Sequence, residues 1–116
     1  MNKIELVQGD TSPIYKFQRK YKDGTVITTQ PKKMWITFKI NHNYEDSILQ
    51  KTLENGIKFE DGYYKFQLFS EDTYNLSYGK YGFDIAILNE NNEKKTLLND
   101  GELEIIPHYT KKKNEV

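Results

Sequence analysis

The sequence predicts an all-β protein, an antiparallel β-sandwich or small barrel of about eight or nine short strands. Hydrophobic and polar residues alternate with period two along most of the chain, and turn residues separate the alternating runs. Nine tyrosines and six phenylalanines accompany a single alanine, Ala86. Aromatic and β-branched side chains suit strands whereas alanine is the best helix former, so the composition favours the same class.

Length and charge limit the possible functions. The chain has 116 residues with 17 basic and 17 acidic side chains, so we expect one domain and no nucleic-acid partner. Cysteine is absent, which excludes disulfides and thiolate chemistry. The apolar runs are too short to span a membrane, and the first ten residues lack the apolar core of a signal peptide. We therefore expect no membrane partner.

The first strands follow from the alternation. Residues 3–7 alternate and run into the turn cluster 9–13. Residues 15–19 alternate up to Asp23-Gly24, a favoured hairpin pair, and residues 25–29 are all β-branched. Each of these runs is expected to be extended.

The segment 34–40 is the clearest strand, because its two faces differ in polarity. The face expected in the core carries Met34, Ile36, Phe38 and Ile40. The opposite face carries Trp35, Thr37 and Lys39. An outward-facing tryptophan is therefore expected on this strand.

Further strands are expected at 48–53, 57–59, 63–69 and 81–87, followed by a final hairpin of 95–98 and 102–106 around Asn99-Asp100-Gly101. Asn55-Gly56 and Asp61-Gly62 supply earlier turns. The alternation then defines an inter-sheet core, which is expected to contain Met34, Ile36, Phe38, Tyr64, Phe66, Leu68, Phe83, Ile85 and Leu103.

One short helical turn is expected near residues 70–76, where the alternation stops. Ser70 is placed to cap it, with Glu71 and Asp72 at its positive end. Asp72 and Thr73 can close their own turn through side-chain bonds to nearby amides.

No constellation of residues predicts an enzyme. The two histidines, His42 and His108, have no ligand spacing, and surface positions explain them. The acidic turns lack calcium-loop spacing, and nothing places Glu71, Asp72 or Asp84 in a carboxylate pair across a cleft. We expect no catalytic residue, no metal and no cofactor.

Exposed aromatic residues are the other candidates for function. Trp35, with Tyr63, Tyr74, Tyr78 and Tyr44, is compatible with a protein interface or with a sugar-stacking platform. A third interpretation is that Trp35 only caps one edge of the core. Lys111, Lys112 and Lys113 belong to a polar tail, 111–116, that is expected to fray, so the domain is expected to span residues 1–110.

The order of several short motifs resembles the N-terminal domain of the phage baseplate upper protein family and related small prophage tail proteins. The match covers roughly residues 6–110. The motifs are Gln8-Gly9-Asp10-Thr11, Asp23-Gly24, Trp35-Ile36-Thr37-Phe38-Lys39, Gln50-Lys51-Thr52-Leu53, Asp61-Gly62-Tyr63-Tyr64, Glu71-Asp72-Thr73, Gly79-Lys80-Tyr81-Gly82-Phe83-Asp84-Ile85 and Thr96-Leu97 with Gly101-Glu102-Leu103.

This resemblance implies an immunoglobulin-like β-sandwich that acts as an assembly part of a siphophage tail tip or baseplate. It implies no catalytic residue, tail or baseplate proteins as partners, and a place in the virion after assembly in the bacterial host cytoplasm. Family members commonly continue into a coiled coil or a receptor-binding-protein anchor, whereas this chain stops at Val116. The attachment role of that part is therefore not carried over.

Physical features support the fold that the resemblance implies. The spacing from Leu76 through Gly79 to Tyr81 is similar to the corner of immunoglobulin-like sandwiches, where a tyrosine hydroxyl bonds back to local backbone. We expect a non-enzymatic virion component that forms homo-oligomers or partner complexes. A carbohydrate-binding module for a cell-surface glycan and a host accessory or immunity-type protein remain open alternatives.

Overall fold

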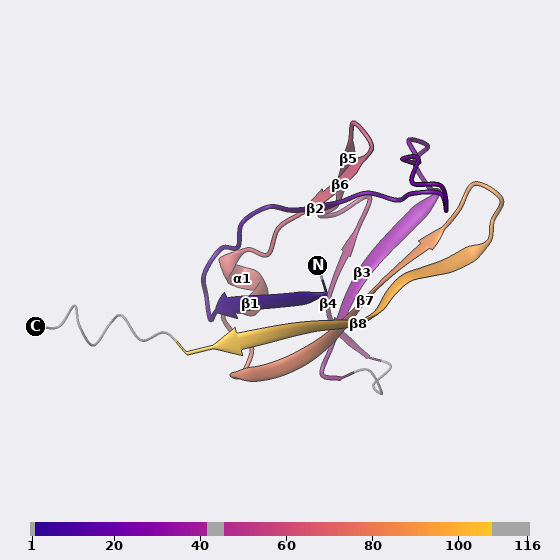
Figure 1. The fold of residues 1–116 in the computed structure, drawn as a ribbon. Helices are drawn as coiled ribbons and strands as arrows, with labels where there is room; N and C mark the ends of the chain where they lie inside the picture. Colours follow the sequence, from indigo (N-terminus) through magenta and orange to yellow (C-terminus); the bar gives the residue numbers. More distant parts are fainter. Residues whose placement is uncertain (1, 42–45, 108–116) are drawn as a thin grey trace, which may run out of the picture.

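The protein is almost entirely β-structure in a computed structural model that describes residues 2–41 and 46–107. Within these ranges the elements are β1 (Lys3–Val7), β2 (Tyr15–Phe17), β3 (Lys33–Lys39), β4 (Ser47–Thr52), β5 (Lys58–Glu60), β6 (Tyr63–Phe66), α1 (Ser70–Thr73), β7 (Gly79–Leu88) and β8 (Lys94–Ile106) (Figure 1). The all-β class and the short helical turn are confirmed.

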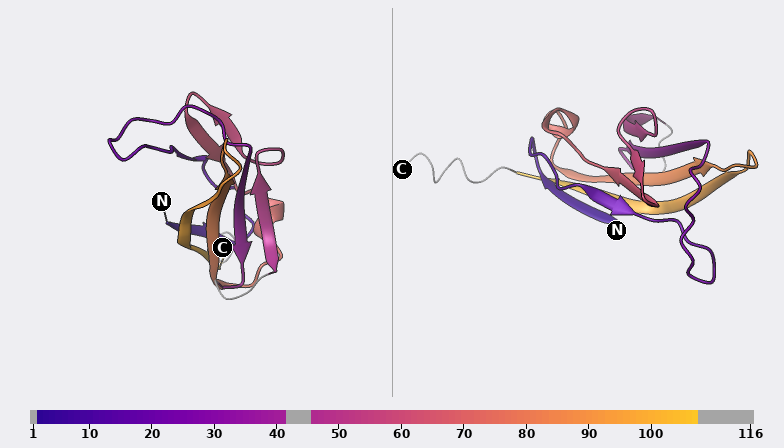
Figure 2. Two further views of the ribbon diagram at one scale, coloured as in Figure 1. Left: turned by 90° about the vertical axis from the view of Figure 1, so that its right-hand side faces the viewer. Right: turned by 90° about the horizontal axis from the view of Figure 1, so that it is seen from above.

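The strands form two sheets. One has five strands in the order β1-β8-β7-β3-β4, and the other has three strands in the order β2-β6-β5. Figure 2 shows the larger sheet curving beneath the smaller one. The sheets are not wholly antiparallel, because β1 pairs with β8 in parallel. These are the first and last strands, so no tight turn fixes their relative direction, and alternation carries no information about it.

The core lies between the two sheets. All nine residues expected there are buried: Met34, Ile36, Phe38, Tyr64, Phe66, Leu68, Phe83, Ile85 and Leu103. Aromatic rings from both sheets contribute, with the Phe38 and Phe83 centroids 5.1 Å apart and the Phe17 and Tyr64 centroids 5.3 Å apart. The inward side chains of each sheet therefore fill one layer, as period-two patterning requires.

Two expected features at strand ends are wrong. Ile40 is 50% exposed, since β3 ends at Lys39 and a bulge interrupts its pairing with β4 after Phe38. Residues 25–29 form no strand, and only an isolated bridge between Lys20 and Val26 is present there. β-branched composition alone did not make that segment a strand, because it has no long neighbour to pair with.

The expected final hairpin is also wrong, because β8 is one continuous strand of 13 residues. Its partner β7 is reached instead through the loop at Asn89–Glu93, where Asn92 has a φ of 64°. Gly101 lies inside β8 and is buried against Phe83. A Cβ at Gly101 would lie 2.6 Å from the Phe83 ring, so the glycine provides space for an aromatic ring and does not form a turn.

The turn around α1 differs in detail from the expectation. Phe69, and not Ser70, occupies the position before the first helical residue, and its N–H donates to Asp72 Oδ2 at 2.7 Å. Asp72 therefore closes its own turn, as predicted. Thr73 is fully buried, and its hydroxyl accepts from the distant Gly9 N–H at 3.4 Å.

The predicted tyrosine corner is present. Tyr81 donates its hydroxyl hydrogen to the Ser77 carbonyl at 2.7 Å, four residues upstream at the start of β7. This bond fixes how the chain enters the central strand.

Candidate binding surfaces

The expected interface residues do not form one platform. Trp35 lies on the outer face of the five-stranded sheet, and Tyr63 lies on the outer face of the three-stranded sheet. Outer faces of a sandwich point in opposite directions, so these two rings cannot contact one ligand. Tyr74 and Tyr78 are each 56% exposed in the segment between α1 and β7. Tyr44 lies outside the described residues.

Trp35 is half-buried in a shallow groove of about 470 Å³ on the outer face of the larger sheet. Apart from Trp35 and Ala86, the side chains that line the groove are polar. Gln50 donates to the Thr37 hydroxyl at 3.0 Å, and Lys39 pairs with Asp84 at 3.6 Å. An indole beside amide, hydroxyl and carboxylate groups offers both a stacking surface and hydrogen bonds.

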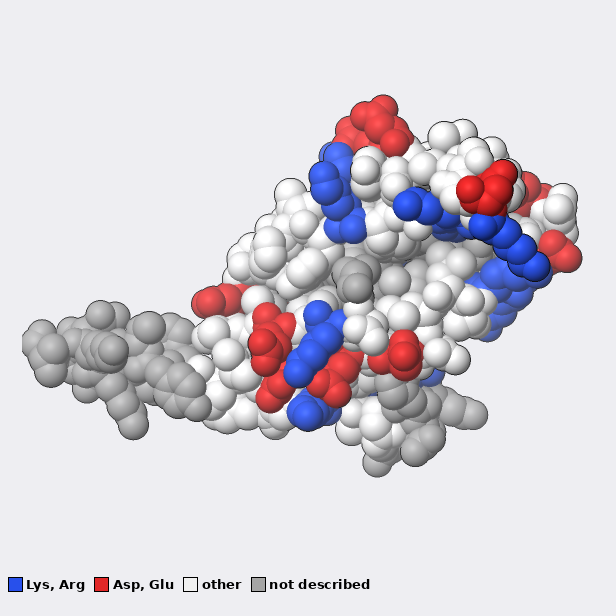
Figure 3. All heavy atoms as spheres, in the orientation of Figure 1, with Lys and Arg blue, Asp and Glu red and all other residues white. Residues whose placement is uncertain are grey.

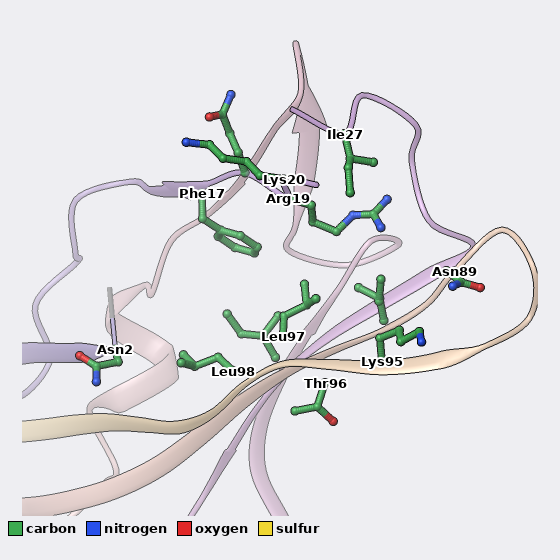
Figure 4. A pocket seen from close by; sticks show the side chains of 13 residues that line it. Asn2, Phe17, Arg19, Lys20, Ile27, Asn89, Lys95, Thr96, Leu97 and Leu98 are labelled. Atoms are coloured by element: carbon green, nitrogen blue, oxygen red, sulfur yellow. The ribbon is translucent and has the colours of Figure 1, made fainter. Parts of the chain in front are cut away.

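A second and larger groove, of about 630 Å³, opens between the two sheets (Figure 4). Phe17 and Ile27 enter it from one side, and Leu97 and Leu98 enter it from β8 on the other. Ile85 and Ile87 of β7 also line it. The groove is apolar along its floor, because inward-facing strand residues meet there and Ile27 joins them from a loop.

Among the residues that the structure describes, none forms a second strand on the edge of β8 beside this groove. β1 pairs only with Glu102–Ile106, so within the described residues Lys94–Gly101 has β7 as its one strand neighbour. β2 is the edge strand of the smaller sheet and faces the same groove through Phe17. Unpaired strand backbone next to apolar side chains is a template for strand addition.

Arg19 ties the two sheets together at one end of this groove. It is 9% exposed; its Nε donates to Tyr64 Oη at 3.0 Å and its Nη2 to the Thr29 carbonyl at 2.7 Å. Nη2 also lies 3.3 Å from Glu90 in the β7–β8 loop. Burial raises the pKa of the Tyr64 phenol above its ordinary value of 10.0, although the bond from Arg19 opposes that shift.

The opposite edge of the larger sheet is protected. Lys51 points inward from the edge strand β4, is 8% exposed, and its Nζ lies 2.9 Å from Asp72 Oδ2. An inward charge on an edge strand opposes pairing with another chain, because strand addition there would have to desolvate it. Alternation gave no sign of this role, since it places Lys51 at an apolar position.

The titratable residues singled out in the sequence fall into two groups, those that the structure describes and those outside the described ranges. Over 2–41 and 46–107, no group of three or more His, Asp or Glu side chains is arranged to hold a metal ion. His42, His108 and the lysines at 111–113 lie outside these ranges. Asp23 acts as a turn residue, because its Oδ1 accepts from the Thr25 N–H at 2.9 Å, a bond that lowers its pKa.

Sequence reasoning identified Trp35 as outward-facing but missed the groove between the sheets. Its lining residues run from Asn2 to Leu98, 96 positions apart, so no local pattern marks it. The adjacent pair Leu97-Leu98, which breaks the alternation of β8, is the one sequence signal that could have pointed there.

Comparison with known proteins adds no family. No protein-family model matches the chain, and no curated protein is significantly similar to it. Among the described residues no helix is long and apolar enough to cross a membrane.

Proposed function

We propose that this protein is a non-enzymatic assembly component of a phage or prophage particle, in the tail or baseplate, that acts through protein–protein contacts. One observation carries the binding half of the proposal: the open edge of β8 lies beside an apolar groove of about 630 Å³. Such a surface suits a partner chain better than a small polar substrate, because it combines unpaired backbone with apolar area. The place in a virion rests on the motif resemblance.

Charge also permits assembly. The formal net charge is zero, so no strong like-charge repulsion opposes association with copies or partners. Tyr74 and Tyr78, both exposed, offer further anchors of the type enriched at interfaces.

The test is mass spectrometry of particles purified from a strain that carries the gene. The proposal expects the chain in the particles at a copy number comparable to other tail proteins. Its absence from intact particles, with the protein abundant in the same cells, would overturn the assignment.

Glycan binding is the second candidate, and the groove around Trp35 favours it. If a cell-surface glycan stacks there, its addition should change Trp35 fluorescence, and Trp35→Ala should abolish binding while Tyr63→Ala leaves it intact. Trp35 is the chain's one tryptophan, so the signal is unambiguous. Equal loss in both variants would exclude this groove as the site.

A further inference from the structure

We propose that the open edge of β8 accepts an extended segment of a partner protein, which adds as a strand in line with β1 and fills the groove between the sheets. This inference rests on the proposed assembly function and names the surface and the kind of partner that it uses.

The position of β1 shows how the edge can be continued. Lys3 is opposite Glu102, and the Glu102 N–H donates to the Asn2 carbonyl at 2.8 Å. Strand pairing on this side of β8 stops at that point. Over Lys94–Gly101, β8 pairs with β7 on one side, and no strand of the described residues lies on the other side; this open stretch is about 25 Å long at the rise of a strand. A segment of six to eight residues, roughly, would therefore extend the line of β1 along it.

The side chains define what such a segment carries. Alternate residues of an added strand point to one face, which here is the apolar floor formed by Phe17, Ile27, Ile85, Ile87, Leu97 and Leu98. Leu97 lines the groove and is 40% exposed, so an added strand would bury more of its side chain. The partner segment should thus alternate apolar with polar residues.

The basic rim of the groove indicates that the partner segment carries an acidic residue. Lys20 and Lys95 line the groove, and Figure 3 shows basic side chains on the right of the molecule, where Figure 1 places the β7–β8 hairpin. Arg19, in contrast, already has Glu90 as its counter-ion. An acidic side chain at the end of the segment near Lys95 would complement the rim.

Other sheet edges are poorer acceptors. β2 and β5 have three residues each, β1 has five, and β4 carries the inward Lys51 with its Asp72 partner. The free stretch of β8 is longer than these strands and lies over an apolar groove. Strand addition is therefore expected at β8.

The test uses synthetic ten-residue peptides of alternating valine and threonine, capped at both ends, with two glutamates at either the N- or the C-terminus. Two control peptides replace the glutamates by lysines or the valines by prolines. Binding to the full chain is followed by NMR, as shifts and slowed hydrogen exchange of backbone amides. We expect changes confined to alternate amides of Lys94–Gly101 and to groove residues, with the better glutamate position reporting strand direction.

The controls make the result specific. The lysine peptide should bind more weakly, and the proline peptide should not bind, because proline at alternate positions removes half of the backbone N–H groups and is poorly accommodated in a strand ladder. Leu97→Lys should weaken binding by roughly three- to eightfold, because the 40% of Leu97 that is still exposed would otherwise be buried by the added strand. Ile40→Lys, at a similarly exposed residue away from the groove, should not.

Three outcomes would overturn the inference: no peptide binds, the changes map to the Trp35 groove, or the free protein dimerises through β8 in a manner that Leu97→Lys abolishes. The last would make a second copy the occupant. Failure here with the chain present in particles would leave the assembly function standing. If a peptide binds but the chain is absent from particles, strand addition at β8 would stand and the assembly function would be overturned.

Discussion

Gly101→Ala adds one atom, a Cβ, where β8 packs against the Phe83 ring of β7, and so tests how tightly these two strands pack. A Cβ there would lie 2.6–2.7 Å from three carbons of the Phe83 ring, whereas unstrained carbon contacts are about 3.5–4.0 Å. Phe83 is fully buried and packs against Phe38, so its ring cannot shift without displacing other core side chains. Such overpacking costs about 1–3 kcal/mol. Gly101 is not in the left-handed region, so alanine also gains about 0.5 kcal/mol by restricting the unfolded chain.

The net expectation is a loss of about 1–2 kcal/mol, or a fall in Tm of roughly 4–8 °C for a domain of this size. Urea unfolding followed by circular dichroism measures it, with Asp100→Ala, at an exposed neighbour, as control. In a Phe83→Ala background the clash is gone, so Gly101→Ala should become neutral or slightly stabilising. An equal loss in both backgrounds would refute the steric explanation, because backbone strain would then be the cause.

Three further predictions follow from the interior. Phe38→Ala and Phe66→Ala should each lower the unfolding free energy by about 3–5 kcal/mol in urea titrations; losses below about 1 kcal/mol at both would show that the facing assignment is wrong. Lys51→Met should lower the unfolding free energy by about 3 kcal/mol, because it leaves the nearly buried Asp72 without its cation. The double variant Lys51→Met with Asp72→Asn should recover part of that loss. Equal unfolding free energies for the single and double variants would contradict the pairing. Burial raises the pKa of the Tyr64 phenol, so the neutral phenol stabilises the folded state. This contribution to the unfolding free energy is complete below about pH 10, the range in which the unfolded phenol ionises, and is lost as pH rises through the folded-state pKa. Urea midpoints should fall above that pH less steeply in Tyr64→Phe than in the wild type, and parallel curves would count against this origin.

The core was predictable because period-two alternation decides which face of a strand is buried, whatever its neighbours are. Met34, Ile36 and Phe38 follow from that alone. Gly101 shows where local reasoning fails: after Asn-Asp a glycine predicts a turn, but its reason is the ring of Phe83, 18 positions earlier in the chain.

The candidate surfaces divide in the same way. Trp35 faces outward as its alternation predicts, yet its separation from Tyr63 depends on which sheet each strand joins. The groove over β8 depends on where β1 stops pairing, which is a property of the assembled sheet. Lys51 occupies an inward position on the edge strand β4, where its charge opposes pairing with another chain. The sequence alone does not show that β4 is an edge strand, so this role could not be predicted.

Hydrogen exchange of β8 tests the central claim most directly. The protein is compared free in solution and in purified particles, with exchange quenched before digestion and mass analysis. An added strand should slow exchange at backbone amides in Lys94–Gly101 while leaving Glu102–Ile106, already paired with β1, nearly unchanged. Equal exchange of Lys94–Gly101 in the free and assembled protein would contradict the claim that this edge is the assembly surface.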